Sequence, residues 1–265
     1  MNPIRHFLLA VQFFTRIPIT GRLARWVGYS PAMLRASAAH FPGVGWLVAL
    51  LACLVYAGCS VALPDNALRP LAAAVACTVA SVLLTGGFHE DGLADVADGL
   101  GGSAERQRAL DIMKDSRIGA FGAMALVLAL LFKVALLAVL GGEGLDTALA
   151  ALVGGQVLSR FLPLLLVRTM AHVGDAASSK SKPLADQITH GALACAALWC
   201  FAPLALVAWR EGAWFLIVPV ITSALALLQM RRLFARRLQG FTGDCLGATQ
   251  QVCEIAFYLG AALAL

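Results

Sequence analysis

Apolar segments long enough to cross a lipid bilayer recur along the chain. A helix needs roughly 20 apolar residues to cross the hydrocarbon layer, with a usual range of about 17–25. Such segments occupy residues 43–63, 70–85, 121–140, 147–167, 191–209, 213–228 and 246–265. Inside lipid every backbone N–H and C=O needs a partner within the protein, which restricts spanning segments of this kind to helices. The sequence therefore predicts an all-α, polytopic transmembrane bundle.

The bundle is predicted to have six or seven spans, because two of the segments are weaker than the rest. Residues 70–85 are slightly short, and Gln250, Gln251 and Glu254 interrupt the last segment. No internal repeat divides the chain, so we expect one integral membrane domain over residues 1–265. Residues 4–16 predict a further interfacial or re-entrant helix, which Pro18 stops.

The composition excludes an ordinary soluble domain. Charged residues make up 13% of the chain and hydrophobic residues 60%, with a mean hydropathy of +0.81. Soluble domains carry roughly 25% charged residues. The net charge of +5 is modest, and we attribute it to loop arginines rather than to nucleic-acid binding. The seven cysteines include no CxxC pair and predict neither a disulfide framework nor a zinc site.

Lysine and arginine alternate from one connection to the next. The N-terminal arm and residues 86–120, 168–190 and 229–245 hold 16 of them, whereas the other connections hold only Arg69 and Arg210. Such residues collect on the cytoplasmic side of a membrane protein. We therefore expect a multi-pass protein of the bacterial inner membrane with its polar loops in the cytoplasm. Within one of them, residues 178–182 predict a loop over an anionic substrate.

Residues 86–120 form a cytoplasmic acidic loop in which five aspartates are spaced as on helices. The first three stand at i, i+4 and i+7, and the last two at i and i+4, the second pair on a helix expected from 104 to about 115. The residues are Asp91, Asp95, Asp98, Asp111 and Asp115. Carboxylates on one helix face repel one another unless a cation lies between them. Hard oxygen ligands suit Mg²⁺, with Mn²⁺ as an alternative, and the pattern predicts a metal site.

A simpler interpretation is a solvated acidic loop whose charges pair with Arg106, Arg108 and Arg117. Glycine-rich flanks and the amphipathic character of the first helix favour the metal site instead. Acids beside a bilayer are also costly unless they have a function.

The chemistry expected of such a site is phosphoryl transfer. A divalent ion would bridge diphosphate oxygens and favour in-line attack by an alcohol. We expect the catalytic residues to be His89, Asp91 and Asp95, with His89 or a carboxylate accepting the alcohol's proton. A hydrogen bond from His89 to a carboxylate is the alternative role. The residues expected to bind substrate or phosphate are Glu90, Lys114, Arg117, Arg160 and Asp244.

Two of these residues lie outside the acidic loop. Asp244 belongs to a glycine-rich turn at residues 240–248, whose backbone N–H groups suit a phosphate. The alternative for Asp244 is an N-cap at the start of the last helix. Arg160 lies inside the fourth span, where an arginine normally faces the bundle interior and pairs with an anion.

Several motifs of the chain resemble the cobalamin synthase family, also called adenosylcobinamide-GDP ribazoletransferase. They include the Phe-His-Glu-Asp-Gly-Leu-Ala-Asp block that begins at Phe88, and their order along residues 13–254 is that of the family. The segments are residues 13–18, 41–45, 86–99, 112–122 and 243–248.

The resemblance implies an integral membrane enzyme of the last steps of vitamin B12 assembly. Such an enzyme joins adenosylcobinamide-GDP to α-ribazole or α-ribazole 5′-phosphate, releases GMP and needs Mg²⁺. The resemblance also places the metal and diphosphate on the five aspartates. The sequence leaves open whether the chain forms a homo-oligomer.

Two other classes remain as alternatives. A CDP-alcohol phosphotransferase also uses clustered aspartates, but Asp95 stands where that family's opening motif has an arginine, and Gln107 stands where it has a glycine. A transporter with acidic residues on its pathway would more often carry charges at mid-membrane and an internal repeat.

Overall fold

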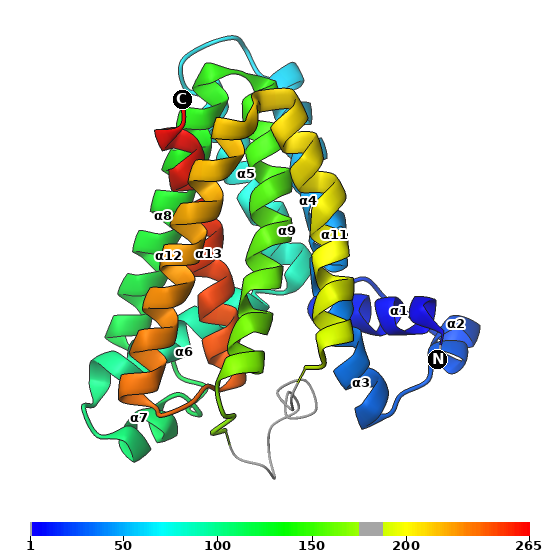
Figure 1. Ribbon diagram of the computed structural model, residues 1–265. Helices are drawn as coiled ribbons and strands as arrows, with labels where there is room; N and C mark the ends of the chain where they lie inside the picture. The colour runs from blue at the N-terminus through cyan, green and yellow to red at the C-terminus, as the bar shows by residue number, and fades with distance from the viewer. Residues whose placement is uncertain (1, 175–187) are drawn as a thin grey trace.

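The computed structural model describes residues 2–174 and 188–265, and its regular structure there is helical apart from an isolated bridge between His172 and Phe241. The predicted loop at residues 178–182 lies outside the described residues. Long helices run side by side and alternate in direction (Figure 1): α4 (Phe41–Ala62), α5 (Arg69–Thr85), α8 (Ala120–Glu143), α9 (Leu145–Thr169), α11 (His190–Glu211), α12 (Ala213–Arg237) and α13 (Gly243–Leu263). The predicted all-α bundle is confirmed.

Five helical segments in the described part of the chain are long and apolar enough to cross a membrane by themselves. They are Pro31–Ala62, Ala120–Glu143, Leu145–Thr169, His190–Glu211 and Ala213–Arg237. A sixth is obtained only if α5 and the next helix count as one bent span. Large apolar side chains such as Leu128 and Leu131 of α8 are exposed, as expected of a surface that faces lipid. The protein is therefore a multi-pass membrane protein with five or six candidate spans.

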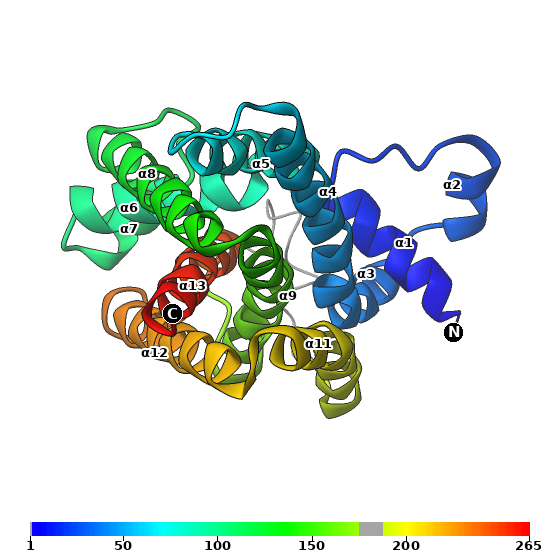
Figure 2. The same cartoon turned by 90° about the horizontal axis from the view of Figure 1, so that it is seen from above.

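The predicted seventh span, residues 246–265, is not among these segments. α13 packs against α6, α8, α9 and α12, in the interior of the bundle (Figure 2). Its polar residues Gln250, Gln251 and Glu254 are buried there against other helices. Because those helices shield α13 from lipid, its sequence carries polar side chains that a lipid-facing span would not tolerate.

The N-terminal arm lies across the bundle rather than along it (Figure 1). α1 (Pro3–Phe14) begins at Asn2, whose Oδ1 accepts a hydrogen bond from Ile4 N at 3.0 Å, and ends before Thr15. The short helices α2 (Gly21–Val27) and α3 (Pro31–Ser37) follow, and the 3-10 turn Ala38–His40 joins α3 to α4. The helix predicted at residues 4–16 is thus present, and its last turn carries Phe13 and Phe14 to the bundle.

A sharp turn sets the acidic helix across the bundle. Gly86 and Gly87 both adopt positive φ values, 69° and 71°, a conformation that favours glycine. The chain consequently turns by 89° between α5 and α6 (Phe88–Gly102), and α6 leads into the short helix α7 (Arg106–Ile112). Close packing fixes α6 in place, since a Cβ at Gly92 would lie 2.8 Å from the carbonyl oxygen of Asp244. Helix α6 is therefore not one of the helices that could cross the membrane by themselves.

Candidate active site

The first two aspartates of α6 face an open cavity of about 640 Å³. Asp91, Asp95 and the buried Glu90 form one wall, and the end of α1 with Thr15 and Arg16 forms another. The segment that leads into α8 contributes further lining residues. The cavity is large enough for a phosphate-containing group and is open to solvent, as a substrate site must be.

Burial and nearby negative charges raise the pKa values of two carboxylates at this wall, Asp95 and Asp244. Burial raises the pKa of Asp95 to about 7, and the negative charges of Asp244, Asp91 and Asp98 add to the shift. Burial also raises the pKa of Asp244, to which the charge of Asp91 contributes. Asp91, Asp95 and Asp244 are therefore near neighbours from two helices. A cation among them would remove the repulsion.

The donor chemistry of these three residues fits Mg²⁺ in kind, because each supplies carboxylate oxygens. Within residues 2–174 and 188–265, no group of three or more His, Cys, Asp or Glu side chains forms a ready-made metal site. The metal site thus stays a prediction, and side-chain rotation on binding is needed to complete it.

Asp98 is bonded to backbone N–H groups, whereas the sequence predicts a metal ligand at this position. Its two carboxylate oxygens accept hydrogen bonds from the backbone N–H groups of Gly119, at 2.7 Å, and Gly122, at 2.8 Å. These groups lie at the start of α8, where backbone donors have no partner within the helix. Asp98 therefore connects α6 to the first turn of α8 by two hydrogen bonds.

The second aspartate pair does not share a helical face. The helix expected to reach about residue 115 ends at Ile112, so Asp111 lies on α7 and Asp115 beyond it. Asp111 accepts a hydrogen bond from Gln107 at 3.1 Å and lies 3.9 Å from Lys114 Nζ. Arg117 Nη2 donates to Asp115 at 2.6 Å, and this interaction lowers the pKa of Asp115 to about 2.

The predicted phosphate ligands Lys114 and Arg117 thus neutralise their own neighbours, Asp111 and Asp115, and none of these four residues lines the cavity. The simpler interpretation, local pairing of acidic and basic side chains, describes this half of the acidic loop. It does not describe Asp91 and Asp95.

His89 and Glu90 are buried. The His89 ring stacks on Phe14, with ring centroids 6.2 Å apart, and burial lowers its pKa well below the usual value, with help from the charges of Arg160 and Lys133. A neutral imidazole with a low pKa is a weak base, so a carboxylate is better suited to accept a proton. Glu90 Oε1 accepts a hydrogen bond from Gln251 at 3.1 Å, and Oε2 has no partner.

Asp244 is not the N-cap of α13. That position belongs to Thr242, whose Oγ1 accepts a hydrogen bond from the backbone N–H of Cys245 at 3.4 Å. Asp244 stands in the first turn instead, where the helix dipole favours an acid, and its carboxylate accepts a bond from Thr242 at 3.2 Å. It therefore adds its charge to the α6 wall.

A buried polar network beneath the cavity escaped the sequence analysis. Lys133 Nζ lies 2.6 Å from Glu254 Oε1, which also accepts hydrogen bonds from Gln156 at 2.6 Å and Tyr258 at 2.9 Å. Gln250 donates to Glu254 Oε2 at 2.8 Å. The only sequence signals were Lys133 within one apolar segment and the three polar residues within the last. Their partners could not be read from spacing along one helix.

Arg160 adjoins this network. Its Nη1 donates to the side-chain oxygen of Gln156 at 2.6 Å, and the negative charges of Glu254 and Glu90 act on it. The prediction that Arg160 faces the bundle interior is confirmed by its 6% exposure. Its role in binding substrate stays a prediction.

Arg16 is a charged residue that lines the cavity and that the predicted site omitted. Its side chain lies over Gly86, where a Cβ would collide with Nε, and its backbone N–H bonds to Leu84 O at 2.7 Å. Among the described residues no hydrogen bond or ion pair of its guanidinium is recorded. Its place in the motif of residues 13–18 was the available signal. The cavity thus has a cation on one wall and carboxylates on another.

Comparisons with known proteins agree with the resemblance seen in the sequence. The family model described as cobalamin-5-phosphate synthase matches residues 6–262. A protein of Polaromonas sp. strain JS666, named adenosylcobinamide-GDP ribazoletransferase, is 63% identical over 100% of both chains. Proteins with the same name from Polaromonas naphthalenivorans and Vibrio cholerae are 64% and 41% identical, over 99% and 96% of this chain and 99% and 91% of their own. No solved structure matches.

The match covers both halves of the acidic loop, the glycine-rich turn before α13 and the N-terminal motif that supplies Arg16. It runs through every helix that forms the cavity, and the three relatives named above are each matched over 91–100% of their own length. This protein belongs to the cobalamin-5-phosphate synthase family.

Proposed function

We propose that the protein transfers the adenosylcobinamide phosphate of adenosylcobinamide-GDP to α-ribazole or α-ribazole 5′-phosphate. GMP leaves, and adenosylcobalamin or its 5′-phosphate is formed. The names of the relatives support this reaction. The observation that carries the proposal is the cavity that Arg16, Asp91 and Asp95 line together. A diphosphate is the kind of group that such a combination of charges binds, once a cation accompanies the acids.

The cation side of the site would consist of Asp91, Asp95 and Asp244, with Mg²⁺ preferred and Mn²⁺ as the alternative. When bound, the ion would supply charge neutralisation on the diphosphate. Arg16, which lines the same cavity, would contact phosphate oxygens without needing a metal ion. Asp98 would keep α6 and α8 in register rather than bind the ion, because its oxygens already accept two backbone hydrogen bonds.

The chemical step is an in-line substitution at phosphorus. A hydroxyl oxygen of the α-ribazole ribose forms a bond to the phosphorus next to the cobinamide arm, and the bond from that phosphorus to the oxygen shared with GMP breaks. The hydroxyl proton passes to a carboxylate of the cavity wall. Asp95 suits this task better than His89, since burial raises the pKa of the first to about 7 and lowers that of the second.

The site would face the cytoplasm, at the inner membrane of the bacterium. This placement rests on the alternation of lysine and arginine between connections. Adenosylcobinamide-GDP could then reach the cavity from the cytoplasm without crossing the bilayer.

The reaction is tested with purified full-length protein in detergent. GMP should be released from adenosylcobinamide-GDP only when α-ribazole and Mg²⁺ are both present, and α-ribazole 5′-phosphate should be assayed in parallel. Cleavage without any acceptor would make the protein a hydrolase and overturn the proposed transfer. Full turnover in the presence of excess chelator would overturn the metal site.

A further inference from the structure

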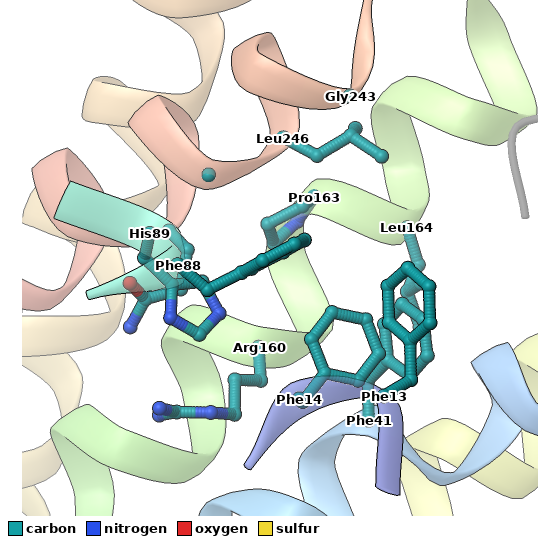
Figure 3. A pocket seen from close by; sticks show the side chains of 12 residues that line it. Phe13, Phe14, Phe41, Phe88, His89, Arg160, Pro163, Leu164, Gly243 and Leu246 are labelled. Carbon is teal, nitrogen blue, oxygen red and sulfur yellow. The ribbon is translucent and has the colours of Figure 1, made fainter. Parts of the chain in front are cut away.

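A pocket lined by aromatic rings lies beside the cavity, where α1, α4, α6, α9 and α13 meet (Figure 3). Aliphatic groups of Pro163, Leu164 and Leu246 complete its walls. Its rings belong to Phe13, Phe14, Phe41 and Phe88. The Phe14 centroid lies 4.0 Å from that of Phe41 and 5.4 Å from that of Phe88. Rings arranged edge to face in this way offer surfaces suited to a flat aromatic ligand.

One buried hydrogen-bond donor at this pocket has no partner. Arg160 lines the pocket, and its Nη1 is bonded to Gln156, but its Nε has no acceptor although the residue is only 6% exposed. A buried donor without a partner is energetically unfavourable. A ligand that brings one acceptor into this apolar pocket would remove that cost.

The pocket is next to the proposed reaction site. Phe13 and Phe88 line both the pocket and the cavity that contains Asp91 and Asp95. A ring held in the pocket would therefore leave its substituent at the carboxylate wall, within reach of the phosphate to be attacked.

We propose that this pocket binds the benzimidazole base of the acceptor, with Arg160 Nε–H donating to the unsubstituted ring nitrogen. This inference rests on the proposed function, since it identifies where one of the two substrates is bound. The base is flat and apolar, carries two methyl groups, and has a single nitrogen acceptor once the other nitrogen bears the ribose. These properties match four phenyl rings and one unpartnered donor.

The guanine of the other substrate fits this pocket less well. Guanine has donors and acceptors along several edges, and each of them would need a partner when buried. The pocket is mainly apolar, and its polar lining consists of His89, Arg160 and Gln250. Gln250 already donates to Ser159 and Glu254, at 2.9 and 2.8 Å.

The pocket is about 50 Å³ without a ligand, less than a base needs, since a cavity of about 150 Å³ is known to hold benzene. One wall must therefore move on binding. Phe88 is the side chain placed to do so, because it is 39% exposed and stands at the first position of α6, after the two left-handed glycines.

Two small probes test the proposal on the intact wild-type protein. 1,5,6-Trimethylbenzimidazole has a methyl group in place of the ribose, and 1,5,6-trimethylindole has the same shape without the acceptor nitrogen. Each is measured as an inhibitor of GMP release and, separately, by calorimetric titration of the protein without substrates. The benzimidazole should compete with α-ribazole and not with adenosylcobinamide-GDP. The indole should bind about tenfold more weakly, because one hydrogen bond is lost.

A pair of leucine variants locates the binding site. Leu246→Trp fills the pocket and should raise KM for α-ribazole at least about tenfold while KM for adenosylcobinamide-GDP changes less than about twofold. Leu206→Trp makes the same change at an exposed position of α11 and should alter neither constant.

The outcomes separate this inference from the proposed function. If GMP is released as proposed but the benzimidazole competes with the nucleotide substrate, or if both probes bind equally, the assignment of the pocket is wrong. An unchanged KM for α-ribazole in a folded Leu246→Trp protein would overturn it as well. If no GMP is released at all, the proposed function fails, and the calorimetric titration alone decides whether the pocket binds the base.

Discussion

The two aspartate pairs of the acidic loop have the same spacing in the sequence and different surroundings in the structure. Asp91 and Asp95 lie on one helix and face an open cavity, where burial and the charges of neighbouring carboxylates raise the pKa of Asp95 to about 7. Asp111 and Asp115 lie on either side of a helix end and are paired with nearby cations, so that the pKa of Asp115 falls to about 2. Opposite pKa shifts thus distinguish a half-buried acid among other carboxylates, Asp95, from an acid paired with a cation, Asp115.

The largest effect is expected at Asp95. Asp95→Asn removes the carboxylate that we assign to catalysis and should lower kcat by about 10³-fold, within the range found for acid–base groups. The same change relieves repulsion among the cavity acids, so the melting temperature without Mg²⁺ should stay constant or rise. Turnover and thermal melting of the purified variant check both points. A protein that melts much earlier would make Asp95 structural.

The second-largest effect is expected at Arg16, the cation that lines the cavity. Arg16→Ala removes the cation opposite the acids and should raise KM for adenosylcobinamide-GDP about 10–100-fold, because charge-assisted hydrogen bonds contribute about 1.5–3 kcal/mol. Arg16→Lys should recover part of the loss. The matched control is Arg22→Ala, which removes an exposed arginine of α2 and should leave KM unchanged. An Arg16→Ala protein with normal KM would exclude this residue from the site.

Asp98 tests whether the third aspartate of α6 belongs to the site or to the fold. Asp98→Asn replaces one of two accepting oxygens by an amide group and should reduce the free energy of unfolding by about 1–3 kcal/mol. The folded fraction should retain measurable turnover. Thermal melting and specific activity distinguish the roles, because a metal ligand would lose activity without loss of stability.

The smallest effect is expected at the paired acids. Asp115→Asn breaks a solvent-accessible ion pair with Arg117 and should change kcat and KM less than about twofold, since such ion pairs contribute little. Steady-state kinetics with both substrates measure this. A large loss of activity would remove the distinction between the two pairs and return Asp115 to the predicted metal site.

The sequence was sufficient for the helical class and for the face that Asp91 and Asp95 share, because both depend on local periodicity. It could not assign Asp98 to the start of α8, or place Asp244 beside α6, since these are contacts between distant segments. It also misjudged the length of the helix after the glycines, where Asp115 lies outside α7. Local spacing predicts which side chains point the same way, and tertiary packing decides what they meet.

Arg16 is a second case in which local spacing in the sequence does not predict a contact between distant segments. No periodic pattern distinguishes it from the other arginines of the N-terminal arm, and only the packing of α1 against the α5–α6 turn brings it to the cavity. The last apolar segment, residues 246–265, shows a related limit. Hydropathy measures contact with lipid, whereas α13 contacts mainly protein.

The pairing of Lys133 with Glu254 has a consequence for biogenesis. The ribosome makes the lysine long before its acidic partner, so α8 must enter the membrane with a charge that nothing yet balances. The C-terminal helix is too polar to insert well alone, and pairing of its Glu254 with Lys133 then favours its insertion. A nascent chain cut short before residue 254 should be recognised as unfinished by membrane quality control, because Lys133 and Arg160 are left in its interior without Glu254.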